Sequence, residues 1–302
     1  MKTKRLLASA GAACAFVLVI IFLSVHCTFA QSPTEIAPKP QATPTPSLEK
    51  KFFVNILKDQ RAIWTSPFHL NSKDGKWIAP LGLTTAALIA TDRRTSGELV
   101  ENGENLDRIR ISKDISQIGS FYGIGGLAAG FYLTGRVTHN ARARETGLLS
   151  TEALIDSALV AGALKTVSQR QRPPVDHTSG EFFDGGSSFP SGHAISAWSV
   201  ATVISKEYGQ HRPLVRLGAY GLATAISLSR FTGRKHFLSD VLVGSAMGYG
   251  IGRYVYQEHH DLSLDAETEG KPDGSQSRLI PRIAPLYSSR IHAYGAMLTW
   301  NF

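Results

Sequence analysis

The chain has 302 residues, of which 43% are hydrophobic and 19% charged, and its formal net charge is +8. This length and composition allow one sizeable core and one main domain. The positive charge favours anionic partners such as phosphate groups or an anionic membrane surface. Nucleic acid is excluded as an expected partner, because no run of lysine and arginine interleaved with aromatic residues occurs.

Residues 1–30 are typical of a targeting segment. Three basic residues precede an apolar stretch from residue 6 to 25, and the segment ends in Ala30, a small residue that signal peptidases prefer. The apolar stretch is long for a signal peptide, so an uncleaved N-terminal anchor is the alternative. Both cysteines, Cys14 and Cys27, lie in this segment, which leaves the rest of the chain without a thiol.

Two segments separate this region from the main domain. Residues 31–50 are rich in proline and small polar residues, a composition that favours an extended linker. Residues 51–111 are expected to form an N-terminal extension. Its apolar stretch at 77–91 is short and contains Pro80, so it is expected to lie at a membrane interface rather than to cross the bilayer.

Six apolar segments predict the fold, at 77–91, 112–136, 147–170, 191–208, 212–230 and 236–257. They lack sustained period-two alternation, which favours helices over strands. Small residues recur every fourth position, and this spacing lets helices approach closely. The repeats are Gly244, Gly248 and Gly252, and Gly126 and Gly130. We therefore expect an all-α fold, an antiparallel helical bundle of about six helices embedded in a membrane.

Residues 258–302 are expected to form a polar segment and a C-terminal tail. The stretch 259–279 is polar, whereas 290–302 alternates between polar and apolar residues and ends in Trp300 and Phe302. The alternation indicates a strand or a packed tail. No function is assigned to this part.

Three short fragments concentrate residues suited to phosphate chemistry. They are KTVSQRQRP at 165–173, PSGH at 190–193 and SRFTGRKHFLSD at 229–240. Together they supply cations, a serine, two histidines and an aspartate, which can hold a phosphate and break its ester bond. In an up-and-down bundle the third-to-fourth and fifth-to-sixth connections lie at the same end, so the three fragments are expected to meet there.

The spacing within these fragments places individual side chains. Lys165 and Arg172 are seven residues apart, nearly two turns, and are expected on one face at the end of the third helix. The fourth helix is expected to begin near Ser191, where free backbone N–H groups favour an anion and Gly192 allows close approach. His236 is expected to open the sixth helix.

The fragments resemble the three motifs of the type 2 phosphatidic acid phosphatase superfamily, which also includes bacterial acid phosphatases and vanadium haloperoxidases. The motifs are Lys, six residues, Arg-Pro; Pro-Ser-Gly-His; and Ser-Arg, five residues, His, three residues, Asp. All three are complete in this sequence. The similarity covers about residues 112–257, which are therefore the expected phosphatase core domain.

The resemblance implies a reaction through a phosphohistidine, and the chemistry of the residues agrees with it. His236 is the expected nucleophile, His193 the proton donor to the leaving oxygen, and Asp240 the carboxylate that orients the imidazole. The phosphate would be bound by Lys165, Arg172, Arg230, the Ser191 hydroxyl and the Gly192 amide.

Other polar residues are expected to have no part in the chemistry. Arg170 is expected to be solvated, although it could enlarge the positive field. No cofactor and no metal site are expected, and His259 and His260 have no neighbouring acids at a spacing that would make a ligand set.

Loop charges predict the orientation in the membrane. Basic residues gather in the two loops opposite the expected site, around 136–144 and 206–216, and basic loops face the cytoplasm. The active site would then face the periplasm, either in an inner-membrane protein with five spans or in a chain exported to the periplasm.

The expected activity is hydrolysis of a lipid phosphate or diphosphate without a metal. The family implies phosphatidate, phosphatidylglycerol phosphate and undecaprenyl diphosphate as candidate substrates. The alternatives are a soluble exported acid phosphatase, a vanadate-dependent haloperoxidase and a noncatalytic membrane scaffold. The sequence does not specify the oligomeric state.

Overall fold

Helices account for most of the part of the chain that the structure describes. The computed structural model describes residues 48–72, 74–101, 106–173, 180–210, 212–264, 282–288 and 293–299. Its helices are α2 (Leu48–Thr65), the 3-10 helix η1 (Ser66–His69), α3 (Gly75–Glu101), α4 (Leu106–Ile118), α5 (Phe121–Val137), α6 (Ala141–Ser168), α7 (Gly192–Tyr208), α8 (Pro213–Thr232) and α9 (Leu238–His259). The expectation of an all-α helical bundle is confirmed for the described residues up to His260. They form eight α-helices instead of the expected six or so.

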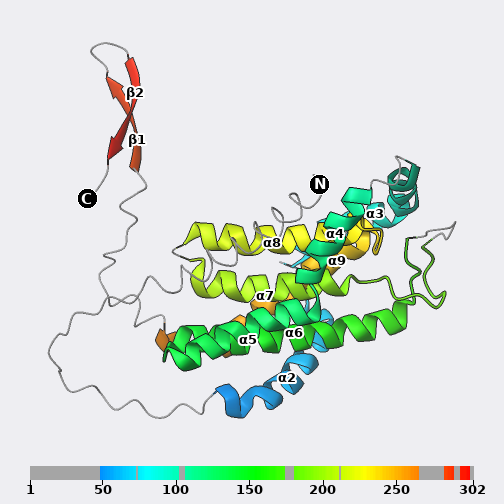
Figure 1. Ribbon diagram of the computed structural model, residues 1–302, viewed down its shortest axis with the longest axis horizontal. Coiled ribbons are helices and arrows are strands. Elements are labelled where there is room, and N and C mark those ends of the chain that lie inside the picture. Colours follow the sequence, from blue (N-terminus) through cyan, green and yellow to red (C-terminus); the bar gives the residue numbers. More distant parts are fainter. Residues whose placement is uncertain are drawn as a thin grey trace, which may run out of the picture. The chain divides into compact units, whose positions relative to one another are not determined.

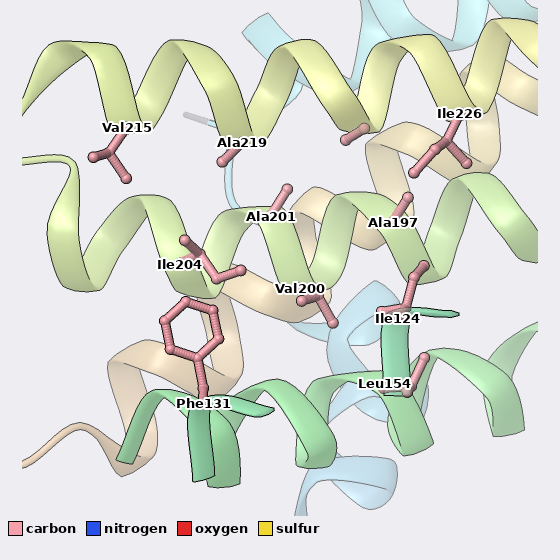
Figure 2. Close-up of a cluster of buried hydrophobic side chains, with 11 residues drawn as sticks. Ile124, Phe131, Leu154, Ala197, Val200, Ala201, Ile204, Val215, Ala219 and Ile226 are labelled. Carbon is pink, nitrogen blue, oxygen red and sulfur yellow. The ribbon is translucent and has the colours of Figure 1, made fainter. Parts of the chain in front are cut away.

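Helix α7 lies at the centre of the bundle, between α6 and α8 (Figure 1). One face of α7 packs on α5 and α8 through side chains such as Val200 and Ile204, and Phe131 of α5 packs against this face (Figure 2). Another face packs on α6 and α9 around Ile195 and Val203, both fully buried. Because α7 is enclosed by its neighbours, its first turn is fixed relative to the ends of α6, α8 and α9.

Glycines in α9 bring it close to α7. An added Cβ at Gly248 would lie 2.2 Å from the carbonyl oxygen of Ile195, and one at Gly252 would lie 2.2 Å from that of Ser199. The predicted close approach is therefore confirmed for this repeat. It is wrong for Gly126 and Gly130, because neither would bring a Cβ within 4 Å of another atom outside its own helix.

Four predicted helix boundaries are wrong. The segment predicted at 77–91 is part of the longer helix α3, and α9 begins at Leu238, so His236 precedes this helix instead of opening it. The segment 112–136 is not one helix: α4 ends at Ile118 and α5 begins at Phe121, with the Ser120 hydroxyl accepting a hydrogen bond from Gly123 N at 3.1 Å. The third predicted helix ends at Ser168, because Gln169 adopts a left-handed conformation with φ 42°. Arg172 therefore lies in the following loop and not on a helical face shared with Lys165.

The C-terminal unit, from Asp261, contains an antiparallel hairpin of β1 (Arg282–Ser288) and β2 (Ala293–Thr299). Arg282 pairs with Thr299, and Tyr287 pairs with Tyr294. A strand was one of the two predictions for 290–302, and it is confirmed for β2. Its partner β1 was not predicted. The predictions for residues 1–30, for most of 31–50 and for most of 259–279 lie outside the described residues.

One described helix, α6, is long and apolar enough to cross a bilayer. Its best window has a mean hydropathy of 1.4, and 56% of that window is buried inside the bundle. The apolar stretch at 6–25 lies outside the described residues and is not counted among these helices. By length and composition the structure therefore offers one candidate span where the sequence predicted five.

Candidate active site

The three fragments meet at one end of the bundle, where α6 ends and α7 begins. The backbone N–H of Ser191 donates to the carbonyl of Asp240 at 3.1 Å. The hydroxyl of Ser168, the last residue of α6, donates to the carbonyl of Phe189 at 2.9 Å. These contacts join the end of α6, the loop before α7 and the start of α9, so side chains from all three fragments share one site.

His236 is buried between α8 and α9, with 2% of its surface exposed. Its Nδ1 lies 2.7 Å from the backbone carbonyl of Ser188. A carbonyl can only accept, so Nδ1 carries the proton and the lone pair of Nε2 is available for attack. The carboxylate of Asp240 is 3.6 Å from Nδ1, outside hydrogen-bond distance. In this structure a main-chain oxygen, not Asp240 directly, fixes the tautomer of His236.

Asp240 is fully buried and holds the surroundings of His236 together. Its carboxylate accepts a hydrogen bond from the hydroxyl of Ser188 at 2.5 Å and from Phe237 N at 3.0 Å. It also accepts one from Arg170 at 2.6 Å. Asp240 thus caps the first turn of α9 and anchors the same residue, Ser188, whose carbonyl orients the imidazole.

Arg170 is buried and forms two ion pairs, so the prediction that its side chain is solvated is wrong. Only 2% of its surface is exposed. One guanidinium nitrogen donates to Asp240, and another donates to Asp92 on α3 at 3.0 Å. The guanidinium lies over the rings of Phe182 and Phe237, at 4.7 and 4.3 Å from their centres. Arg170 therefore links α3 to the site.

Sequence reasoning missed this network because its members are far apart in the chain. Asp92 is 78 residues from Arg170 and also accepts hydrogen bonds from the backbone N–H and the hydroxyl of Ser239. The one available signal was an acid directly after the apolar stretch at 77–91, since a carboxylate that is buried needs a partner. Nothing in the spacing identified that partner.

Two of the three expected phosphate-binding cations converge on Ser187. Lys165 Nζ donates to the Ser187 carbonyl at 2.5 Å, and a guanidinium nitrogen of Arg172 lies 3.4 Å from the Ser187 hydroxyl. The structure thus brings Lys165 and Arg172 together through the loop, although they do not share a helix. Arg230, in the last turn of α8, donates to Ser116 on α4, and its buried Nε has no hydrogen-bond partner.

Ser191 and Gly192 form the start of α7. The hydroxyl of Ser191 is fully buried and has no hydrogen-bond partner, and it does not cap the helix. The backbone N–H groups of the first turn point out of the helix and favour an anion. A buried hydroxyl next to such amides is a donor set for phosphate oxygens.

Burial and neighbouring cations keep both histidines of the site neutral. Burial, with Arg230 as the next contribution, lowers the pKa of His193 to about 4. Burial also lowers the pKa of His236, although Asp240 acts in the opposite direction. At neutral pH the imidazole of His236 is therefore neutral, with its proton on Nδ1 and a lone pair on Nε2. A bound phosphate dianion would favour the protonated form of His193, because its charge opposes that of the cations.

Two groups of acids and histidines that could hold a metal ion lie outside this site. One consists of Asp59, Glu152 and His259, and the other of Glu145, Glu207 and His260. The prediction that His259 and His260 have no acidic neighbours at usable spacing is wrong, because helix packing supplies acids from distant parts of the chain.

The comparisons with known proteins agree with the motifs. Residues 146–263, a range that contains all three fragments, match the model of the PAP2 superfamily. The lipid A 1-phosphatase of Porphyromonas gingivalis is 38% identical over 69 residues, 23% of this chain and 16% of that protein. The decaprenylphosphoryl-5-phosphoribose phosphatase of Mycobacterium tuberculosis is 33% identical over 126 residues, 41% of this chain and 66% of that protein. The chain therefore spans from about a sixth to just under two thirds of these relatives.

Among solved structures, one match is the transmembrane PAP2-type phosphatidylglycerolphosphate phosphatase of Bacillus subtilis. It shares 21% sequence identity with this chain, and the TM-score is 0.46. The match covers 72% of this chain and 96% of that one.

Proposed function

Because residues 146–263 match the model of the PAP2 superfamily, we propose that the protein is a phosphatase that removes phosphate from a lipid phosphate or diphosphate. The observation that carries this proposal is the 2.7 Å contact between Nδ1 of His236 and the backbone carbonyl of Ser188. This Nδ1 donates to the carbonyl, which leaves Nε2 as a buried nucleophile at a site with three cationic side chains.

The first half of the reaction transfers the phosphoryl group to the protein. Nε2 of His236 attacks phosphorus while the ester P–O bond breaks, and His193 gives a proton to the leaving oxygen. Lys165, Arg172 and Arg230 balance the charge on the equatorial oxygens. The Ser191 hydroxyl and the Gly192 amide donate hydrogen bonds to the same oxygens.

The second half releases phosphate and restores the site. His193, now neutral, takes a proton from a water molecule, and the resulting hydroxide attacks phosphorus as the P–N bond to His236 breaks. Phosphate leaves, and Nε2 regains its lone pair. Every step is carried by side chains and main-chain groups of this chain, so we propose a metal-independent mechanism.

Exposed apolar side chains support a lipid substrate and a membrane location. Large hydrophobic residues with more than two thirds of their surface exposed occur along several helices: Trp77 and Leu83 on α3, Tyr122 and Val137 on α5, and Leu214 and Leu217 on α8. We propose that these helices contact lipid, with the basic loops at the opposite end in the cytoplasm and the active site facing the periplasm.

A groove between α4 and α8 supports binding of an apolar chain. It has a volume of about 430 Å³ and is lined by apolar side chains such as Ile111, Ile115 and Leu228, with polar residues between them. Ser229 also lines the groove and directly precedes the phosphate-binding residue Arg230. The groove is therefore positioned to hold a hydrocarbon chain attached to a phosphate bound at Arg230.

The nucleophile is tested with the variant His236→Gln. We expect phosphate release to fall roughly 10⁴-fold or more, because the covalent step has no replacement nucleophile. Brief reaction with a ³²P-labelled lipid phosphate should label wild type on histidine and leave the variant unlabelled. His69→Gln is the matched control, since His69 is exposed. Undiminished release by His236→Gln would overturn the proposal.

The lipid substrate is tested with Ala225→Trp, which fills the groove at an exposed position of α8. We expect KM to rise about tenfold or more for long-chain lipid phosphates and kcat/KM to be unchanged for a water-soluble phosphate monoester, because roughly 1.4 kcal/mol of apolar contact corresponds to a factor of ten. An equal effect on both substrates would contradict the assignment of the groove. Release of the protein from membranes by carbonate without detergent would instead favour a soluble acid phosphatase.

A further inference from the structure

We propose that Asp59, Glu152 and His259 form a binding site for a divalent transition-metal ion, with Asp156 beside them. This site is separate from the phosphatase site and does not depend on the proposed function. It joins three helices: Asp59 lies on α2, Glu152 and Asp156 on α6, and His259 is the last residue of α9.

The geometry of the three ligands fits a single ion. Their nearest ligand atoms all lie within 4.8 Å of one another. Nε2 of His259 is 2.9 Å from one carboxylate oxygen of Asp59 and 3.7 Å from Oε1 of Glu152. An ion bound at about 2.0–2.2 Å from each ligand would occupy the space between these atoms.

Buried oxygens without partners point to a missing cation. Glu152 has 2% of its surface exposed, and its Oε1, which faces His259, has no hydrogen-bond partner. Asp156 is fully buried, and its Oδ2 has no partner either, although Gln60 donates to its Oδ1 at 2.9 Å. Leaving such oxygens without a donor or a cation in the interior is costly.

The charges of the cluster lead to the same conclusion. Asp59 and Glu152 both pair with the imidazole of His259, which is the one basic side chain that pairs with either of them within the described part of the chain. Ionised carboxylates can lie this close in a buried site when a divalent cation balances their charge. A metal ion would replace the proton on Nε2 of His259 and bind the free oxygen of Glu152.

The donor set selects the kind of ion. An imidazole nitrogen with carboxylate oxygens suits Zn²⁺ or Mn²⁺, whereas Ca²⁺ and Mg²⁺ prefer ligand sets made only of oxygens. The His259 side chain is 13% exposed, whereas those of Asp59 and Glu152 are 1% and 2% exposed. The ion would therefore enter past His259.

The position of the site indicates a structural role. Glu152 lies thirteen residues before Lys165 on the same helix, which corresponds to about 20 Å along its axis. An ion there touches no group of the phosphatase site. By binding α2 to α6 and α9, it would hold the N-terminal extension against the core domain.

The experiment uses the full chain, purified in detergent, stripped with a chelator and titrated with Zn²⁺. Bound metal is measured by mass spectrometry of the metal and affinity by calorimetry. We expect Glu152→Gln and His259→Ala each to bind one equivalent less than wild type, or to bind that equivalent more than about 100-fold more weakly. Zn²⁺ should raise the Tm of wild type and leave that of the two variants unchanged. Glu258→Gln is the control, because this acid is exposed and adjacent to His259.

Two results would overturn the site: variants that bind as much Zn²⁺ as wild type with equal affinity, or a wild type that binds none. If neither variant folds, the site is tested by adding Co²⁺ to the metal-free wild type and recording its visible absorption spectrum. Visible absorption bands of Co²⁺ bound to nitrogen and oxygen would support the site, and their absence would overturn it. A chain that binds zinc but releases no phosphate would refute only the proposed function, since these readouts do not measure catalysis.

Discussion

Replacing Arg170 with methionine should destabilise the protein strongly. The change keeps an alkyl stem between the rings of Phe182 and Phe237 but removes the charge that pairs with Asp92 and Asp240. Both ion pairs are almost completely buried, with side chains no more than 3% exposed. Removing one partner of a buried pair costs about 3–5 kcal/mol, because the remaining charge loses its compensation.

The assay is thermal unfolding of the purified protein, followed by circular dichroism. A loss of about 3–5 kcal/mol corresponds to a Tm lower by roughly 6–20 °C for a domain of this size. The matched control is Arg94→Met. Arg94 pairs with Glu98 at 3.2 Å, but the two side chains are 86% and 58% exposed, so the change should shift Tm by less than about 2 °C.

The contrast between the two arginines is the decisive result. If Arg170→Met unfolds within about 2 °C of wild type, the buried network does not contribute to stability and our reasoning about it is wrong. If both arginine variants unfold early, the loss does not depend on burial, and the same reasoning fails. Only a large shift confined to Arg170 supports it.

Two further predictions concern helix packing and protonation. Gly248→Ala should lower the free energy of unfolding by about 1–3 kcal/mol in chemical denaturation, because its Cβ would lie 2.2 Å from the Ile195 carbonyl oxygen. The control is Gly250→Ala on the same helix, which should leave this free energy unchanged or raise it, because its Cβ would meet no atom within 4 Å. Asp240→Asn should move the acid limb of the pH profile of kcat/KM to lower pH. Burial lowers the pKa of His236 and the charge of Asp240 raises it, and the substitution removes only the contribution of the charge. An acid limb that moves to higher pH would contradict this assignment.

The helices and the meeting of the motifs could be predicted from sequence because they depend on local patterns. Apolar segments of sufficient length locate α6 to α9, and the alternating positions of helix ends bring 165–173, 190–193 and 229–240 to one end. The place of Arg172 could not be predicted. A single left-handed residue, Gln169, ends α6 before the prolines do, and such a backbone reversal at a residue other than glycine leaves little trace in the sequence.

The partners of buried charged side chains could not be predicted for a different reason. Asp92 reaches Arg170 from α3, and Asp59 reaches His259 across 200 residues of chain. A pattern within one helix cannot show which distant side chain completes a buried ion pair. The partner of each buried acid could be identified only from the packing of the helices.

The hydrogen bond from His236 to the Ser188 carbonyl has a consequence for how the protein tolerates mutation. Every residue at position 188 presents a carbonyl, so side-chain substitution there does not in itself remove the acceptor. Ser188→Ala would delete the bond to Asp240 and still leave the main-chain acceptor for the imidazole. The orientation of the nucleophile is thus encoded in the path of the backbone and not in the identity of a residue. It can be lost through an insertion or deletion in the loop more readily than through a point mutation.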